Sequence, residues 1–225
     1  MPIHFEYMDS RYSALNRSIF LSSSIPDPSR WSGEYDALEI TDAVVALARE
    51  CLSRGYRIVT AAHPTIAPLL LYVAAEFPRS ESEPPMILVY QSLLFENILP
   101  VSTRRFESDG VGEITWTIAA DGDLPKPGHW DPSLTAMREI MLTDTTPSAA
   151  IFVGGMIGIL EEREAFGRFC PDRPVYAIST PGGAAADLTG QSPESVREYL
   201  RVSRSYPAVW AAVLDDLEST LPNGG

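Results

Sequence analysis

Apolar residues follow two patterns along the chain: short unbroken runs, and longer stretches in which they recur with helical spacing. The runs at 18–24 (SIFLSSS) and 149–155 (AAIFVGG) are typical of strands buried on both faces of a parallel sheet. The segment 111–120 alternates only in part, which indicates a strand nearer an edge. Together these patterns predict six strands, at 18–24, 56–61, 86–91, 111–120, 149–155 and 174–180.

Helical spacing is clearest at 37–55, where Gly55 is suited to the C-terminal cap. Strands and helices alternate with short connections. We therefore predict an α/β fold: a Rossmann-like, mostly parallel central sheet with helices on both faces. The predicted helices are 37–55, 65–77, 132–142, 158–169 and two pieces of the tail, broken before Pro207.

The chain is expected to form a single domain over residues 1–225, with a core at about 18–188 and a helical C-terminal appendage at about 193–221. No internal repeat or low-complexity tract divides it. Several apolar residues of the appendage are most simply core residues, and the alternative is a contact with a second copy or an effector. They are Val209, Trp210, Val213, Leu214 and Leu217.

The charge balance narrows the range of partners. The 17 Lys and Arg against 30 Asp and Glu give a net charge of −13, and 45% of the residues are hydrophobic, as in globular proteins. No cluster of Lys and Arg is present, so nucleic-acid binding is not expected. A small anionic ligand is compatible with this charge, because a helix N-terminus and a single Arg hold a phosphate even in an acidic protein.

The cysteines and histidines show neither a disulfide framework nor metal-ligand spacing. Cys51 and Cys170 are interpreted as small apolar packing residues, and His4, His63 and His129 are scattered, so we expect no metal and no bound cofactor. The N-terminal segment has no basic region followed by an apolar run, and the longest apolar stretch is too short to span a bilayer. We expect a cytoplasmic protein without direct membrane insertion.

Ligands of such sheets bind where strands end and helices begin, and three strand ends here carry unusual residues. The first strand ends in Ser22, Ser23 and Ser24, whose plain interpretation is a turn or cap. The second is followed by His63 and Thr65, which offer polar groups to a ligand, although a loop histidine is more often structural.

The third strand end, the segment 154–162 (GGMIGILEE), carries the strongest signal. Its glycines let a phosphate approach the backbone closely, and the first N–H groups of the following helix point at it. A bulky residue at Gly155 is therefore expected to fill the phosphate space. Arg138, sixteen residues before Gly154, lies in a helix rich in apolar residues; the alternative is an arginine that reaches the surface.

These segments together resemble the SLOG superfamily, the Rossmann-like group that includes the LOG cytokinin-activating enzymes and DprA-like proteins. The resemblance rests on MREIML around Arg138, GGMIGILEE at 154–162 and PGGAA at 181–185. It is closest to the prokaryotic SLOG domains that accompany TIR and sirtuin-like modules in anti-phage defence, which are also similar in FLSSSIPDP and HPTIAP. It runs from about Ser18 to Leu188.

The resemblance implies two different functions. LOG enzymes hydrolyse the N-glycosidic bond of a nucleoside monophosphate with a helix Arg and the last Glu of PGGxGTxxE, which correspond to Arg138 and Glu162. This chain has Val153 for the motif Pro, one residue inserted before Gly158, and Ile159 for the Thr. In the defence branch, the domain senses an NAD-derived nucleotide and alters assembly or a partner's activity.

We therefore expect a sensor of an NAD-derived nucleotide signal, ADP-ribose or a cyclic ADP-ribose isomer, in an antiviral defence system. Its expected partners are this second messenger, a TIR-domain or membrane effector, and further copies in a homo-oligomer. The alternatives are a LOG-like nucleoside-monophosphate N-glycosidase with Arg138 and Glu162 catalytic, and a structural subunit without a ligand. The expected ligand- or phosphate-binding residues are Ser22, Ser23, Ser24, His63, Thr65, Arg138, Gly154, Gly155, Met156, Gly158, Glu161, Glu162, Gly182 and Gly183.

Overall fold

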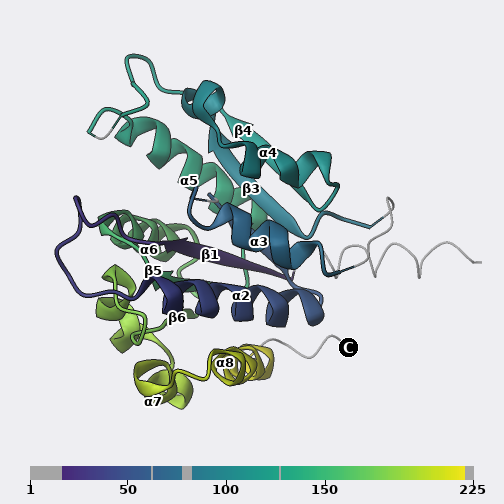
Figure 1. The fold of residues 1–225 in the computed structure, drawn as a ribbon, viewed down its shortest axis with the longest axis vertical. Coiled ribbons are helices and arrows are strands. Elements are labelled where there is room, and N and C mark those ends of the chain that lie inside the picture. The colour runs from purple at the N-terminus through teal and green to yellow at the C-terminus, as the bar shows by residue number, and fades with distance from the viewer. Residues whose placement is uncertain (1–16, 62, 78–82, 127, 221–225) are drawn as a thin grey trace, which may run out of the picture.

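The short apolar runs form one sheet of six parallel strands in a computed structural model, which describes residues 17–61, 63–77, 83–126 and 128–220 (Figure 1). Across the sheet the order is β4-β3-β2-β1-β5-β6, and every pairing is parallel. The predicted Rossmann-like α/β fold is therefore confirmed, with the segment 111–120 at an edge. The strands are β1 (Ser18–Ser24), β2 (Arg57–Thr60), β3 (Ile87–Ser92), β4 (Gly112–Thr117), β5 (Ala149–Gly154) and β6 (Val175–Ala177).

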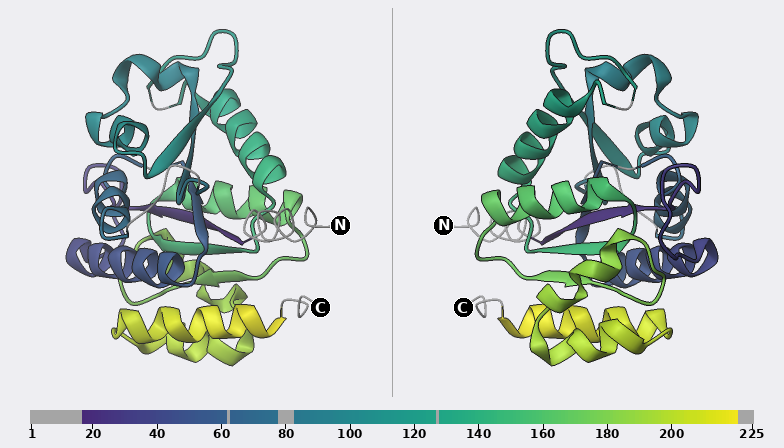
Figure 2. Two further views of the ribbon diagram at one scale, coloured as in Figure 1. Left: turned by 90° about the vertical axis from the view of Figure 1, so that its right-hand side faces the viewer. Right: turned by 90° about the vertical axis from the view of Figure 1, so that its left-hand side faces the viewer.

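Helices cover both faces of this sheet (Figure 2). The first face carries α2 (Ala37–Ser53), α3 (Ala67–Ala74), α4 (Val101–Ser108), α7 (Glu194–Val202) and α8 (Tyr206–Thr220). The second face carries α5 (Asp131–Thr145), α6 (Ile157–Phe169) and the 3-10 helix η2 (Ala184–Gln191). The helices therefore bury both sides of the strands.

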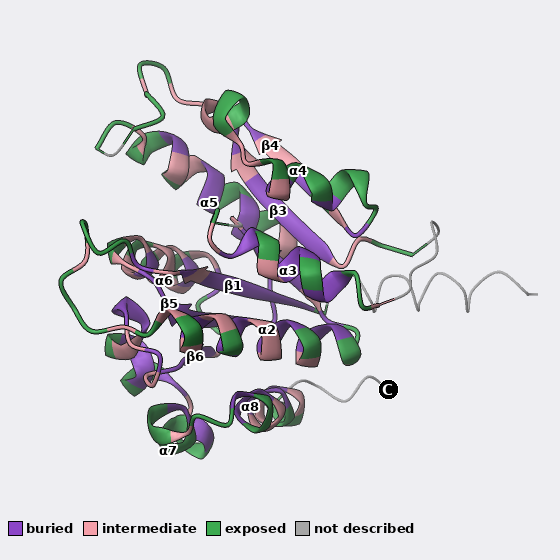
Figure 3. Ribbon diagram, in the orientation of Figure 1, coloured by how far each residue is buried: buried purple, intermediate pink, exposed green. Residues whose placement is uncertain are grey.

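Alternate residues of each strand point to opposite faces, which explains the unbroken apolar runs. In β5, Ile151 and Val153 join the cluster on the α2 face, and Phe152 joins the cluster on the α6 face. In β1, Phe20 stacks on Phe166 of α6 with ring centroids 6.1 Å apart. Figure 3 shows β1 buried along most of its length, and every residue of β5 is buried.

Three short elements were not predicted: η1 (Leu93–Ile98), α4 and η2. In α4 only Thr103 and Phe106 are buried, which is too few apolar positions to produce a helical pattern. The predicted helix at 65–77 is shorter as α3, because residues 64–66 form a separate turn before it.

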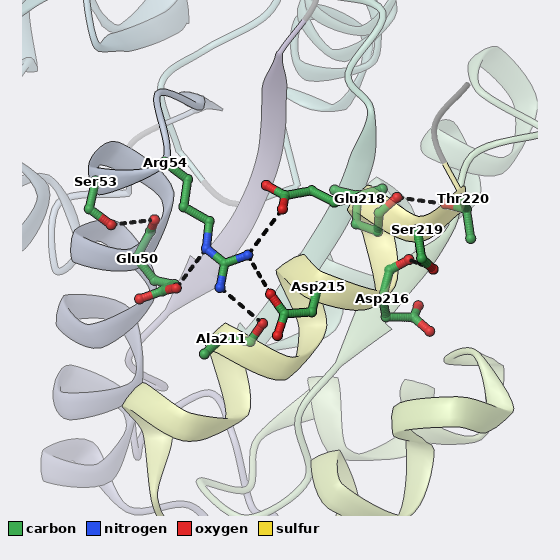
Figure 4. Close-up of polar contacts among 10 residues, drawn as sticks. Glu50, Ser53, Arg54, Ala211, Asp215, Asp216, Glu218, Ser219 and Thr220 are labelled. Atoms are coloured by element: carbon green, nitrogen blue, oxygen red, sulfur yellow. Dashed lines mark hydrogen bonds and ion pairs between the residues drawn. The ribbon is translucent and has the colours of Figure 1, made fainter. Parts of the chain in front are cut away.

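The tail helices belong to the core. The five apolar side chains singled out in the tail are fully buried, and the indole Nε1 of Trp210 donates a hydrogen bond to the Ala43 carbonyl at 2.8 Å. Arg54, at the end of α2, reaches across to α8: its Nη1 donates to Asp215 Oδ1 at 2.7 Å (Figure 4). The packing of α8 on α2 is thus both apolar and ionic.

The strand order places the ends of β1 and β5 side by side. The chain proceeds outward from β1 to β4, returns through α5, and continues from β5 to β6. Ser24 is paired with Gly154, and the Gly155 N–H donates to the Ser24 carbonyl at 2.7 Å. The order of the strands reverses at this point, which is where open parallel sheets bind ligands.

Candidate functional site

A cavity of about 510 Å³ opens where β1 and β5 end, a size in the usual range for small-molecule sites. Its wall combines the end of β1, the start of α6, one face of α5 and the loops after β2 and β3. Most of the predicted site residues line it: Ser22, Ser23, Ser24, His63, Arg138, Met156, Gly158, Glu161 and Glu162.

Arg138 is a buried arginine, not one that reaches the surface. It projects from the face of α5 that also buries Met137 and Met141, and only 8% of it is exposed. Its Nη1 donates to Glu161 Oε2 at 2.9 Å, and its Nε lies 3.6 Å from Glu162 Oε1. Helix α5 thus holds the guanidinium against the first turns of α6.

Glu162 is the more buried of the two carboxyl groups around Arg138. Burial raises its pKa, while Arg138 and the nearby Ser22 hydroxyl partly oppose that shift. The Ser22 hydroxyl is itself buried. One cation therefore faces two carboxyl groups, one of which holds its proton more tightly than an exposed glutamate.

Gly154 and Gly155 shape the turn between β5 and α6 and do not border open space. Both have positive φ, 63° and 74°, which glycine adopts without strain. A Cβ at Gly155 would overlap the side chain of Ile159. The expectation that a bulky residue there enters a phosphate space is corrected: it would enter packed protein.

Gly158 is the glycine of this segment that faces the cavity. A Cβ there would meet only Arg138 Nη2, at 3.7 Å. The first turn of α6 has no side-chain cap at Met156. The start of α6 therefore lines the cavity with a first turn that no side chain caps, the arrangement on which anion sites at helix N-termini are built.

Gly182 and Gly183 lie elsewhere. They line a second hollow of about 710 Å³, together with Tyr35 and Asp36 at the start of α2. A Cβ at Gly183 would overlap the backbone of Gly154. This glycine therefore allows two loops to pack closely, and the structure does not bring the pair into the first cavity.

His63 and Thr65 divide their roles. The Thr65 hydroxyl accepts a hydrogen bond from the Ile25 N–H at 3.0 Å and lies 2.9 Å from His63 Nδ1. The Thr65 N–H also points at Nδ1, at 3.4 Å. Nδ1 therefore acts as the acceptor, and in the neutral ring Nε2 carries the proton. Thr65 connects the loop after β2 to Ile25 after β1, and His63 offers its Nε2–H to the cavity as a hydrogen-bond donor.

The pKa of His63 is lowered. The ring is solvent-accessible at the rim, but the surrounding protein displaces enough water to disfavour the imidazolium, and Arg30 lowers the pKa further. His63 is therefore a neutral hydrogen-bond donor at neutral pH.

One comparison with known proteins identifies the family of this chain. The model of the SLOG cluster3 family matches residues 30–214. The chain belongs to the SLOG cluster3 family. The crystal structure of TM1055, a structural genomics target, is similar to this SLOG domain at 14% identity over 77% of this chain and 81% of that chain, with a TM-score of 0.45. No curated protein matches the chain.

The extent of the match differs from the expected resemblance at both ends. It begins at Arg30, after β1, and continues through α7 into α8. The family pattern of this SLOG domain therefore includes tail helices that the sequence had suggested to be an appendage. The membership identifies a nucleotide-related Rossmann-like domain.

Several residues that line the SLOG cavity were not predicted from the sequence. Phe95 of η1 and Trp130, at the start of α5, form an aromatic pair with centroids 5.6 Å apart. Gln91 near the end of β3 and Arg30 in the loop after β1 also line it. Aromatic and cationic residues in otherwise polar loops after predicted strands are a signal that would have identified some of them.

Two further observations concern the described part of the chain. No group of three or more His, Cys, Asp or Glu in it is placed to hold a metal ion. None of its helices is long and apolar enough to cross a membrane. The N-terminal segment and His4 lie outside the described residues.

Proposed function

We propose that this SLOG domain binds an NAD-derived nucleotide signal, ADP-ribose or a cyclic ADP-ribose isomer, and acts as a sensor without turnover in an antiviral defence system. One observation carries the proposal. The cavity at the β1–β5 junction combines an uncapped helix start, buried charged groups and an aromatic pair in one space. These are the groups that a phosphate, a ribose and a base each need.

The phosphate has two partners in this arrangement. The start of α6 supplies backbone N–H groups and the positive end of the helix dipole. Arg30 lines the cavity, and no ion pair joins it to a carboxylate among the described residues. Arg138 is already paired with Glu161, so Arg30 is the arginine with more charge available to an anion.

Other residues that line the cavity have the chemistry to bind the ribose and the base. Carboxyl groups of Glu161 and Glu162 accept hydrogen bonds from ribose hydroxyls. Phe95 and Trp130 offer ring faces to a base, and base–aromatic stacking contributes about 1–3 kcal/mol. The output, control of homo-oligomer assembly or of a TIR-domain or membrane effector, rests on the resemblance to defence-associated SLOG domains.

Isothermal titration tests this proposal with ADP-ribose, cyclic ADP-ribose isomers, NAD and AMP. We expect saturable binding of an NAD-derived compound, with the ligand recovered unchanged. Arg30→Gln should weaken it about tenfold or more, as expected for a lost charge-assisted hydrogen bond. Arg168→Gln, at an exposed arginine of α6, is the control and should leave affinity unchanged. Absence of binding by every compound would contradict the proposal.

A LOG-like N-glycosidase is the second candidate, and the Arg138–Glu162 arrangement favours it. A carboxyl group with a raised pKa can give a proton to the departing base while water adds to the ribose carbon. Against it stands Ile159, which is buried and brings no hydroxyl to the phosphate loop. Release of free adenine from AMP, lost in Glu162→Gln, would establish the enzyme and exclude a purely sensing role.

A further inference from the structure

The cavity has two chemically different halves. The half along β1 and α6 carries hydroxyl and charged groups, including the Arg138 cluster. The half along the end of β3, η1 and the start of α5 carries aromatic and aliphatic side chains, a single amide and the exposed carboxylate of Asp131. Its other residues are Gln91, Phe95, Ile98, Leu99, Trp130 and Leu134.

Gln91 has a fixed orientation in this second half. Its side-chain Nε2 donates a hydrogen bond to the main-chain carbonyl of Ala61, just after β2. Because a carbonyl accepts only from the NH2 end of an amide, this contact determines which end is which. The Oε1 atom is left as an acceptor and receives no hydrogen bond from the described residues.

The aromatic pair cannot by itself distinguish one base from another. Phe95 and Trp130 offer ring faces, and stacking on an aromatic ring is tolerant of base identity because every base has a π-face. Discrimination requires a contact to the edge of the base. Gln91 is the amide that this half of the cavity provides for such a contact.

We infer that the nucleotide base lies in this half of the cavity and that Gln91 Oε1 selects a purine with an N–H donor at its 6-position. The inference rests on the proposed function, whose ligands carry adenine, and adds the side chain that recognises this base. Adenine presents an amino group to Oε1. Hypoxanthine presents a carbonyl oxygen there, so two acceptors would face each other with neither satisfied.

Titration of the wild-type protein with three matched ligands tests this inference. The ligands are ADP-ribose, its analogue with unsubstituted purine, and its hypoxanthine analogue. We expect affinity to fall in that order, with about tenfold or more between the first and the last. The unsubstituted purine removes the donor without adding an atom, so it separates a lost hydrogen bond from repulsion.

Two glutamine variants complete the experiment. In Gln91→Met the acceptor is absent, and the adenine and hypoxanthine ligands should bind within about twofold of each other. Gln191→Met is the matched control, because Gln191 is held by Arg163 on α6 and does not line the cavity. The control should keep the wild-type preference.

The outcomes are distinguishable. Equal binding of the three ligands by wild type, or an unchanged preference in Gln91→Met, overturns the role of Gln91 and leaves nucleotide binding intact. If no ligand binds, the proposed function and this inference fail together. If Gln91→Met does not fold, as judged by circular dichroism, the wild-type series decides: purine binding as tight as that of adenine overturns the assignment.

Discussion

Arg138 and Glu162 are charged residue types that usually lie at the surface, but in this fold both are largely buried. Both lie where α5 meets the first turns of α6, and both are largely removed from water. Burial disfavours the charged form of Glu162, while the neighbouring guanidinium favours it. The balance leaves the pKa raised, so this residue gives stability a distinct pH dependence.

Replacing Glu162 with Gln should reveal that dependence. Between the ordinary pKa of 4.5 and the raised folded value, the unfolded carboxyl ionises while the folded one holds its proton. The stability of wild type relative to Glu162→Gln should therefore fall as pH rises through this window, and level off above it. Urea unfolding from about pH 4 to about pH 8 measures the difference. Glu164→Gln, at an exposed carboxyl of the same helix, is the control and should show a much flatter difference.

Arg138→Lys should weaken nucleotide binding. A lysine ammonium cannot reproduce the planar geometry with which the guanidinium faces Glu161 and Glu162 together. We expect an affinity loss of about ten- to a hundredfold, which corresponds to about 1.5–3 kcal/mol. Titration calorimetry compares it with Arg163→Lys, at an arginine that contacts Gln191 outside the cavity. An unchanged dissociation constant would remove Arg138 from the site.

At the scale of elements, the connection from β5 to α6 contains the glycines that were predicted to bind a phosphate. These glycines have different roles. Gly155 has positive φ and lies against Ile159, whereas Gly158 borders the cavity. The hydrogen bond from the Gly155 N–H to Ser24 ties this turn to β1. The turn between β5 and α6 therefore has a structural role, and the start of α6 is the surface available to a ligand.

Two alanine substitutions separate these purposes. Gly155→Ala should lower the free energy of unfolding by about 1–3 kcal/mol, because a left-handed backbone and an occupied neighbouring space both oppose a side chain. Gly158→Ala should leave stability nearly unchanged and weaken nucleotide binding, since the methyl group enters the cavity beside Arg138. Thermal unfolding and titration of both variants measure this. The reverse pattern would place the phosphate at the turn.

On the scale of the whole molecule, the last helix, α8, completes the hydrophobic core on the α2 face of the sheet. Trp210 and its apolar neighbours pack on α2, and Arg54 connects the C-terminal end of α2 to α8. Arg54 also contacts Glu50 at 2.7 Å and the Ala211 carbonyl at 3.3 Å (Figure 4). Helix α2 and the C-terminal helix are therefore joined in one packed layer.

Arg54→Met should destabilise the whole domain. It removes a mostly buried guanidinium and leaves Glu50, Asp215 and Glu218 near one another without their common cation. We expect a loss of about 1–3 kcal/mol in the free energy of unfolding. Arg201→Met, at an exposed arginine of α7, is the control and should change stability by less than about 0.5 kcal/mol. Equal effects in chemical denaturation would show that the α2–α8 contact contributes little.

The sequence by itself determined the six strands, the longer helices and the parallel sheet. A strand covered on both faces must be apolar at every position, and a covering helix must be apolar on one side. Each pattern appears within one short stretch of the sequence, so it can be recognised without the tertiary structure. It also singled out Arg138 and the segment 154–162, most of which lines the cavity. Weakly patterned elements such as α4 escaped, because few of their side chains are buried.

Only the tertiary structure decided which of these places meet. The strand order brings β5 beside β1 and sets α5 against α6, so Arg138 faces Glu161 and Glu162. The same order puts Gly182 and Gly183 beside a different hollow and brings the aromatic and amide groups after β3 into the cavity. The physical reason is that secondary structure depends on neighbours in the chain, whereas a binding site depends on which strand ends the packed sheet places side by side.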